Sequence, residues 1–326
     1  MLYPAATVVA GLLLLAFAAD RFVTAAARLS RHWGMSPILV GALIVGMGTS
    51  APELLVSGLA AAKNEVDLAI GNAVGSNVAN VTMVLGGTAL LTPLAGNLAV
   101  LKREGALMFG AVALLAVMLW DLRVTRVEGI VLLTGMVAAA WLIVRWARLD
   151  RSSSSPASDK PAAEPVSARR EVIAGLLALA LTLLGADLLV RGGTTLAESI
   201  GLGSAFVGMT LIAVGTSLPE LATSIAGIRQ GEHDLVLGNV VGSNLFNALA
   251  VAGIGASLAP GPIDPAFRLG AVAMVLCSTL AGFLALTGRE LVRWEGILLL
   301  FGFAAYVWLS YDPTLVNLAI SAVSGP

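Results

Sequence analysis

Two glutamates lie in the middle of long apolar stretches, where an acid is energetically unfavourable. Glu53 ends the segment Gly-Thr-Ser-Ala-Pro-Glu, and Glu220 ends the segment Gly-Thr-Ser-Leu-Pro-Glu. On a helix, hydroxyls four and three residues before an acid share its face. If these stretches cross a membrane, each carboxylate costs roughly 2.5–3.5 kcal/mol on insertion scales and is a functional candidate. A structural ion pair is the alternative, but no Lys or Arg falls inside an apolar stretch at comparable depth.

Each glutamate directly follows a proline, Pro52 or Pro219. Because proline lacks an N–H, the carbonyl four residues earlier, at Gly48 or Gly215, loses its helical partner and the helix is expected to kink. Freed carbonyls, hydroxyls and a carboxylate on one face make a site of hard oxygen ligands. Such ligands suit Na⁺, Ca²⁺ or Mg²⁺ rather than thiophilic metals, and Mg²⁺ is the least favoured because it releases its waters reluctantly.

A second polar motif, Gly-Asn-x-x-Gly-Ser-Asn-x-x-Asn, follows each acid at residues 71–80 and 238–247. Its serine and its last asparagine are four residues apart and share one helical face. These pairs are Ser76 with Asn80 and Ser243 with Asn247. We interpret them as further cation ligands; hydrogen bonding between helices is the alternative. Asn77 and Asn244 point about 100° away from the serines, so we expect them to bond to neighbouring helices, and the glycines to allow close helix packing.

The two pairs of motifs belong to an internal repeat with an offset of 167 residues. Residues 39–86 and 206–253 align without a gap, and 21 of the 48 aligned residues are identical. The same offset relates Asp20 to Asp187 and Glu128 to Glu295. We interpret the two aspartates as caps or packing partners, and the two glutamates as first-turn residues that complement a helix dipole.

The composition excludes a soluble protein. Of 326 residues, 58% are hydrophobic and 12% are charged, with a mean hydropathy of +0.91, whereas soluble domains have roughly 25% charged residues. Ten apolar stretches approach the length of about 20 residues that a membrane-spanning helix needs. They cover residues 1–19, 37–61, 67–91, 105–121, 127–147, 171–191, 204–228, 234–258, 268–287 and 294–311. The predicted fold class is an all-α integral membrane protein, with the first stretch a retained span rather than a signal peptide.

A polar segment rich in Ser, Pro and Ala divides the ten expected spans into two groups of five. The predicted domains are a first five-span repeat at 1–150, a flexible linker at 151–170 and a second five-span repeat at 171–326. Because five is odd, the second repeat must enter the membrane in the opposite orientation. Such an inverted repeat is common among secondary transporters.

Positive charges predict which side of the membrane each connection faces. With ten spans, the linker is one of the odd-numbered connections, which all lie on the same side of the membrane. These connections carry fourteen Lys and Arg residues, and the connections on the opposite side carry five. The linker is therefore expected in the cytoplasm and both termini outside, in a multi-pass protein of the inner (plasma) membrane. The single cysteine, Cys277, excludes an intrachain disulfide. No basic patch indicates nucleic acid, and no His-Glu-x-x-His or Gly-x-Ser-x-Gly motif indicates an enzyme.

The duplicated motifs resemble the α-repeats of the cation/Ca²⁺ exchanger superfamily, most of all its prokaryotic Na⁺/Ca²⁺ exchanger branch. The resemblance implies a secondary-active antiporter that exchanges Na⁺ for Ca²⁺ by alternating access, as the first and sixth spans slide over a rigid core. It also implies oxygen ligands from both repeats. These are Thr49, Ser50, Glu53, Ser76, Asn80, Thr216, Ser217, Glu220, Ser243 and Asn247, with backbone carbonyls near Gly46 and Ala213. The implied partners are Na⁺, Ca²⁺ and membrane lipid, without a cofactor or an obligatory protein partner.

The chain departs from some members of this superfamily, which have an aspartate where Asn80 or Asn247 stands. Two formal negative charges remain, and one Ca²⁺ or two Na⁺ neutralise them. Proton-coupled members usually have extra acids where this chain has Val74 and Val241, so the resemblance favours Na⁺ coupling. An antiporter of H⁺ and Ca²⁺, or of another divalent cation, with the two glutamates as proton carriers is the alternative. A cation channel or a non-transporting scaffold would be a different class.

Overall fold

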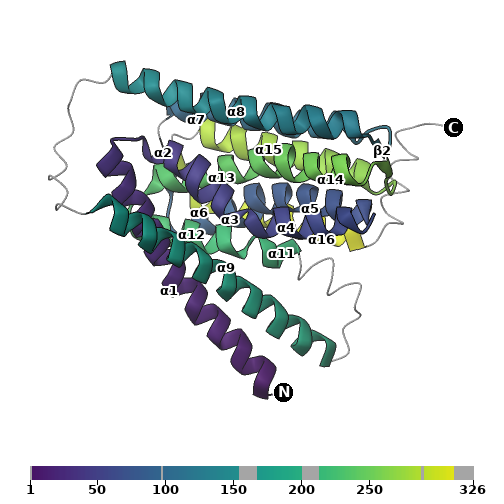
Figure 1. The fold of residues 1–326 in the computed structure, drawn as a ribbon, viewed down its shortest axis with the longest axis horizontal. Helices are drawn as coiled ribbons and strands as arrows, with labels where there is room; N and C mark the ends of the chain where they lie inside the picture. Colours follow the sequence, from purple (N-terminus) through teal and green to yellow (C-terminus); the bar gives the residue numbers. More distant parts are fainter. Residues whose placement is uncertain (1, 97, 154–166, 200–212, 288–289, 312–326) are drawn as a thin grey trace.

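A computed structural model describes residues 2–96, 98–153, 167–199, 213–287 and 290–311, which are almost entirely helical (Figure 1). The first half contains α1 (Leu2–Trp33), α2 (Pro37–Val40), η1 (Gly41–Gly46), α3 (Met47–Thr49), α4 (Ala51–Ala62), α5 (Val66–Ala79), η2 (Asn80–Val84), α6 (Leu85–Leu91), β1 (Leu94–Ala95), α7 (Leu98–Met118), β2 (Arg123–Val124) and α8 (Arg126–Ser153). The second half contains α9 (Ala168–Ser199), α11 (Ala213–Thr216), α12 (Leu218–Arg229), α13 (His233–Phe246), η4 (Asn247–Val251), α14 (Ala252–Leu258), β3 (Gly261–Pro262), α15 (Phe267–Thr287), β4 (Glu290–Leu291) and α16 (Arg293–Tyr311).

Six helical stretches in the described part are long and apolar enough to cross a membrane. They are Tyr3–Trp33, Val66–Leu91, Arg126–Leu149, Ala168–Gly193, His233–Leu258 and Phe267–Thr287. A seventh is added if the bent pair Pro37–Thr49 and Ala51–Ala62 forms one span. Of the other expected spans, 204–228 lies partly outside the described residues. The remaining two correspond to α7 and α16, which are 21 and 19 residues long and carry charged residues near their starts.

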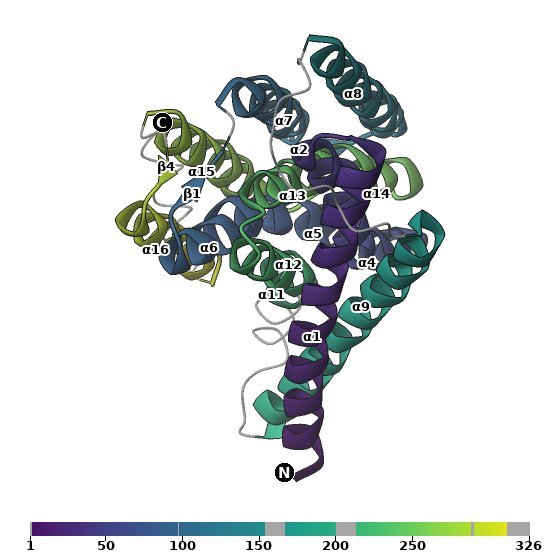
Figure 2. The same ribbon diagram turned by 90° about the vertical axis from the view of Figure 1, so that its left-hand side faces the viewer.

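Helices α1 and α9 are much longer than the spans expected at 1–19 and 171–191. A helix ends at a breaking residue rather than at a change of polarity, and α1 ends just before Gly34, whose φ is 58°. The two helices pack along each other and project from the rest of the bundle (Figure 2). Gly11 and Gly185 make this contact close, because a Cβ on either would lie 2.7 Å from a backbone nitrogen of the other helix.

Helices α8 and α9 extend into the expected linker at 151–170. Helix α8 continues to Ser153 and α9 begins at Ala168, so three residues at each end of this segment are helical. An established helix extends into polar sequence at little cost, because each added residue gains a hydrogen bond without a new nucleation step. Residues 154–166 lie outside the described residues.

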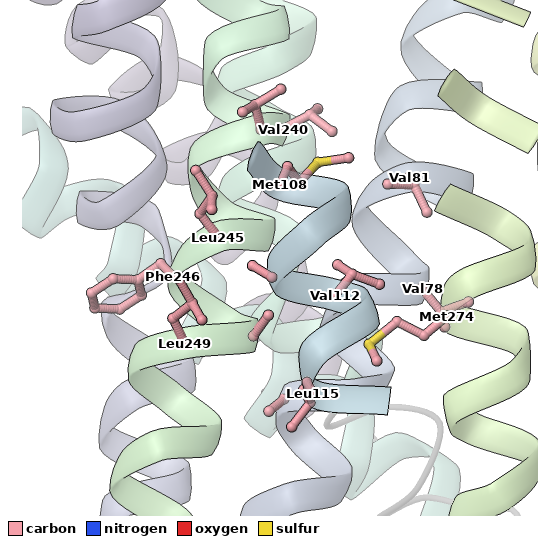
Figure 3. Packing of buried hydrophobic residues seen from close by; sticks show 14 of the residues in the cluster. Val78, Val81, Met108, Val112, Leu115, Val240, Leu245, Phe246, Leu249 and Met274 are labelled. Carbon is pink, nitrogen blue, oxygen red and sulfur yellow. The ribbon is translucent and has the colours of Figure 1, made fainter. Parts of the chain in front are cut away.

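Two helices form the centre of the bundle: the continuous run α5–η2–α6 and its equivalent α13–η4–α14. Both are buried over most or all of their length, although each is long and apolar enough to cross a membrane. Figure 3 shows Val240 of α13 beside Met108 of α7 in the buried cluster. The polar residues of these two helices are therefore held away from both water and lipid.

The two halves of the chain pack on each other in equivalent ways. β1 pairs with β4 and β2 pairs with β3, and the 167-residue offset converts one antiparallel ladder into the other. Close glycine contacts follow the same rule: α6 meets α16 at Gly86 and Gly296, and α14 meets α8 at Gly253 and Gly129. Each half therefore completes the packing of the other.

The closest approach between the halves joins α13 to the segment α2–η1. A Cβ on Gly238 would overlap the carbonyl oxygen of Ile38, and a Cβ on Gly242 would overlap that of Ala42. The close packing predicted for these two glycines is confirmed. The equivalent Gly71 makes only ordinary contact, because its Cβ would lie 3.6 Å from a neighbouring ring.

Substitution of Gly242 tests this packing. We expect Gly242→Ala to lower the melting temperature of the detergent-solubilised protein by several degrees, because the added methyl group forces α13 and η1 apart and overpacking costs roughly 1–3 kcal/mol. Gly282→Ala in α15 is the matched control, since a Cβ there would meet nothing within 4 Å. Equal melting temperatures for the two variants would contradict the close contact.

Candidate cation-binding site

Both glutamates lie just after a break in their helix, as the prolines predict. The chain turns at Ser50 (φ −82°, ψ 11°) before α4 and at Ser217 (φ −86°, ψ 3°) before α12. The first break bends the helix by 44°. Glu53 and Glu220 consequently lie in the first turns of α4 and α12. The positive end of a helix dipole favours a carboxylate at this position.

Glu220 is bonded to residues from both halves of the chain. The hydroxyl of Ser50 donates to Glu220 Oε1 at 2.8 Å, although the two residues are 170 positions apart. The hydroxyl of Ser243 lies 3.4 Å from the same oxygen and 3.2 Å from the carbonyl oxygen of Gly46, the last residue of η1. The first and second repeats therefore meet at one carboxylate.

Glu53 lies beside this cluster. It is close enough to Glu220 for the two carboxylates to repel each other, and it neighbours the Thr216 side chain. The relative exposures of the two acids are 0% and 1%. Two like charges in a buried position are unfavourable unless they are compensated. Neither acid forms an ion pair within the described part of the chain, so a structural pairing with Lys or Arg does not account for them.

Several buried polar atoms of the two acids and of other expected ligands form no hydrogen bond with the described residues. They are both carboxylate oxygens of Glu53, Oε2 of Glu220, the hydroxyls of Ser76 and Ser217, and the side-chain amides of Asn80 and Asn247. Buried polar groups in proteins are nearly always satisfied, so these atoms are candidates for contact with a ligand. Within the described ranges no group of three or more His, Cys, Asp or Glu occurs. An ion here would be held by two carboxylates and neutral oxygens, a donor set that fits a hard cation.

Wide helical turns occur at three of the expected ligand positions. Gly46 ends the π-helix η1, and Asn80 and Asn247 begin the π-helices η2 and η4. Such turns are rare and are frequent at functional sites. The sequence gives no sign of them, because a single wide turn does not change the apolar periodicity of a helix that is buried on all sides.

Thr49 and Ala213 are the remaining expected ligands. Thr49 is fully buried, but its hydroxyl donates to the carbonyl oxygen of Val45 at 2.9 Å. This bond fixes the hydroxyl hydrogen and leaves the oxygen able to accept or ligate. Ala213 begins α11, and residues 200–212 before it lie outside the described part.

The asparagines next to the serines have different partners in the two repeats. Asn244 bonds to the neighbouring helix α7, at 3.6 Å from the sulfur of Met108, as expected. The same expectation is wrong for Asn77, whose amide donates to the carbonyl oxygen of Ala73 in its own helix at 2.8 Å. A buried amide takes the carbonyl of its own helix when no neighbouring acceptor is within reach.

Two asparagines to which the sequence analysis assigned no role tie the acids to the central helices. Asn72 Nδ2 donates to the carbonyl oxygen of Glu53 and to the hydroxyl of Ser57, at 3.0 Å in each case. Its equivalent, Asn239, has Nδ2 3.3 Å from the carbonyl oxygen of Glu220. The sequence did contain a signal for this role, because both asparagines occupy the same position of the duplicated second motif. These amides position each acid through its backbone.

A bundle of apolar helices, with acids buried at broken helices between two equivalent halves, has the characteristics of a membrane transporter. The sequence matches the family described as sodium/calcium exchanger protein over residues 3–145 and 171–311. The chain therefore belongs to this exchanger family.

Individual relatives agree with this assignment. The chain is 41% identical to CaxA of Alkalimonas amylolytica, which is provisionally named an antiporter, over 96% of this chain and 100% of the relative. It is 38% identical to the inner membrane protein YrbG of Escherichia coli K12, over 97% of this chain and 100% of the relative. Its structure is similar to that of the sodium-calcium exchanger NCX_Mj soaked with 2.5 mM Na⁺ and 0.1 mM Ca²⁺, with a TM-score of 0.82 and 28% identity over 94% of this chain and 98% of that chain.

Removal of the Ser50 hydroxyl tests the composition of the site. We expect Ser50→Ala to weaken Ca²⁺ binding roughly tenfold, because a hydrogen bond to a charged group contributes about 1.5–3 kcal/mol and the oxygen is itself a candidate ligand. Calorimetric titration of the purified protein measures this. Thr182→Val is the matched control, since its hydroxyl is also fully buried but donates to Ala178 of its own helix. Unchanged Ca²⁺ affinity in Ser50→Ala would exclude this hydroxyl from the site.

Proposed function

We propose that the protein is a secondary-active antiporter that exchanges Na⁺ for Ca²⁺ by alternating access. The observation that carries the proposal is the bond between Ser50 of one half and Glu220 of the other, beside Glu53 in a buried position. A site at the junction of two halves can be exposed to either side of the membrane when one part moves against the other. Family membership, and the likeness to a structure named as a sodium-calcium exchanger, support the same cargo.

The proposed ligands are oxygens from both halves near the middle of the bilayer. They are the side chains of Thr49, Ser50, Glu53, Ser76, Asn80, Thr216, Ser217, Glu220, Ser243 and Asn247, and the carbonyls near Gly46 and Ala213. Each half would supply one carboxylate, and the other ligands would be neutral. Ca²⁺ accepts six to eight such oxygens in flexible geometry, which suits a site assembled from several helices. The transported ions are the substrates, and no cofactor is part of the proposal.

The proposed topology has ten spans in two inverted five-span repeats, 1–150 and 171–326, joined by a cytoplasmic linker at 151–170. The equivalent ladders and glycine contacts on the two halves support the repeat. The distribution of fourteen against five basic residues supports an orientation with both termini outside. The match to a protein named as an inner membrane protein supports the location.

The charge of the site gives the proposed mechanism. Two carboxylates repel each other until one Ca²⁺ or two Na⁺ neutralise them, so the two loads compete for one set of oxygens. The transporter can adopt a closed, water-free state only when the site is neutralised, because an uncompensated charge in such a state is costly. If more than two Na⁺ exchange for one Ca²⁺, the cycle moves charge, and the membrane potential contributes about 2.3 kcal/mol per charge per 100 mV.

Sodium-driven Ca²⁺ uptake tests this proposal. In proteoliposomes loaded with Na⁺ and diluted into Na⁺-free buffer, we expect uptake of radiolabelled Ca²⁺ that persists when a protonophore is present. Glu53→Gln and Glu220→Gln should each abolish uptake, because one remaining carboxylate does not neutralise Ca²⁺. Glu290→Gln, at an exposed acid on β4, is the control that should transport normally.

Other outcomes of the same assay distinguish the alternatives. Uptake that requires a proton gradient and disappears with the protonophore would contradict Na⁺ coupling and support H⁺/Ca²⁺ antiport. Currents far above the turnover of an antiporter would indicate a channel. Normal uptake in both glutamine variants would remove the two acids from the mechanism.

A further inference from the structure

The C-terminal half of α1 is bonded to the turn between α12 and α13. Gln230 Nε2 donates to the carboxylate and to the carbonyl oxygen of Asp20, at 2.9 Å in each case, and the hydroxyl of Thr24 donates to Gln230 Oε1 at 3.1 Å. Arg31 and Glu232 add an ion pair at 2.7 Å. Helix α12 begins at the turn that holds Glu220, so these bonds join α1 to the far end of the helix that carries a site acid.

The equivalent contact in the other half is not made. The 167-residue offset maps Asp20 onto Asp187 in α9, and Gln230 onto Lys63 in the turn between α4 and α5. Asp187 instead pairs with Arg191 of its own helix at 2.7 Å. Lys63 is exposed, and within the described ranges its side chain has no hydrogen bond or ion pair. Helix α1 also packs along α12, whereas no packing of similar extent joins the described parts of α9 and α4.

Helices α1 and α9 are too closely packed to move independently. A Cβ on Gly11, Gly185 or Gly192 would lie 3.0 Å or less from the backbone of the other helix. Packed interfaces of this kind move as rigid bodies rather than deform. A displacement that takes α1 away from the α12–α13 turn therefore carries α9 with it. Because the halves are equivalent, the mirror position of the pair brings α9 to the α4–α5 turn.

We infer that Lys63 and Asp187 form an ion pair in the opposite state of the transporter, when Asp20 and Gln230 have separated. This inference rests on the proposed exchange function. In that state Asp187 pairs with Lys63 instead of Arg191, and the hydrogen bonds between Gln230 and Asp20 are broken. The two contacts act as alternating latches that hold α1–α9 at one or the other end of its path. An exposed ion pair contributes little to stability, so each latch opens readily.

The two latches differ in chemistry. The contact seen here joins a neutral amide to a carboxylate, with the Arg31–Glu232 ion pair beside it. The inferred contact is itself a pair of full charges. The 167-residue offset replaces both members of the neighbouring ion pair with acids, Glu198 and Glu65, so the second latch has no additional ion pair of this kind. By the proposed topology, the first latch lies at the cytoplasmic surface and the second at the outer surface.

Cysteine cross-linking tests the alternation, because the chain has a single cysteine and Cys277→Ser gives a cysteine-free background. One variant carries Asp20→Cys with Gln230→Cys, and a second carries Asp187→Cys with Lys63→Cys. A control carries Asp187→Cys with Lys102→Cys, and Lys102 lies on α7. A short bifunctional thiol reagent is applied to each variant in proteoliposomes, and Na⁺-driven Ca²⁺ uptake is measured before and after.

We expect both designed pairs to cross-link, the control not to, and each cross-link to stop uptake. A protein with all four substitutions should acquire only one cross-link per molecule, which intact mass spectrometry counts. Absence of the Asp187–Lys63 cross-link above the control, in a variant that transports normally, would overturn the inference and leave the proposed function intact. Two cross-links in one molecule would overturn it as well. Failure of the wild-type protein to take up Ca²⁺ under a Na⁺ gradient would count against the function itself.

A second variant keeps the test independent of cross-linking yield. Lys63→Glu places an acid opposite Asp187 in the inferred state, and we expect uptake to slow by roughly two- to fivefold, the size of an exposed pair interaction. Lys102→Glu is the matched charge reversal at an exposed position of α7 and should not slow uptake. Equal rates in the two variants would contradict the ion pair.

Discussion

The structure depends on two neighbouring carboxylates that are buried and form no ion pair with the described residues. Each acid reaches this position because its helix is broken just before it, at Ser50 or Ser217, and restarts with a proline in its first turn. A broken helix inside a bilayer is tolerated only where its backbone is buried in protein. The glycines of α13 allow η1 to approach within backbone contact, and Asn72 and Asn239 hold the acid-bearing turns against the central helices.

Duplication explains how one such site is assembled and, under the proposed mechanism, how it changes sides. Each half supplies one broken helix, one central helix and the partners that the other half lacks, so neither half forms the site alone. The central helices and the reciprocal ladders make a common body, while α1 and α9 form a separate, tightly packed pair. Among the described residues this pair is bonded to the α12–α13 turn and not to the equivalent α4–α5 turn, so the equivalence of the two halves is broken at the surface. A transporter with two states needs this kind of asymmetry, because the α1–α9 pair cannot contact the α12–α13 turn and the α4–α5 turn at the same time.

The sequence predicted the chemical part of the site better than its geometry. Apolar composition, the prolines before Glu53 and Glu220 and the shared helical faces led to a kinked helix with hard oxygens, and the breaks are present. The length of α1 was wrong, because polarity at Asp20 does not end a helix that a neighbouring helix supports. The π-turns at Asn80 and Asn247 could not be derived, since a single wide turn leaves the apolar periodicity of a buried helix unchanged. The repeated position of Asn72 in the second motif indicated a role, but its partner, the carbonyl oxygen of Glu53, follows only from the packing of the helices. Contacts such as Asp20 with Gln230 join positions 210 apart and follow only from the assembled fold.

Anomalous diffraction from crystals soaked in Ca²⁺ or its heavier congener Sr²⁺ is the most direct test of the central claim, a hard-cation site shared by both halves. The account predicts one strong peak within about 2.3–2.6 Å of a carboxylate oxygen of Glu53 and of Glu220 for Ca²⁺. It also predicts that high Na⁺ removes this peak, because the two loads compete for the same oxygens. A peak bound to only one of the two acids, or one that persists at high Na⁺, would contradict it.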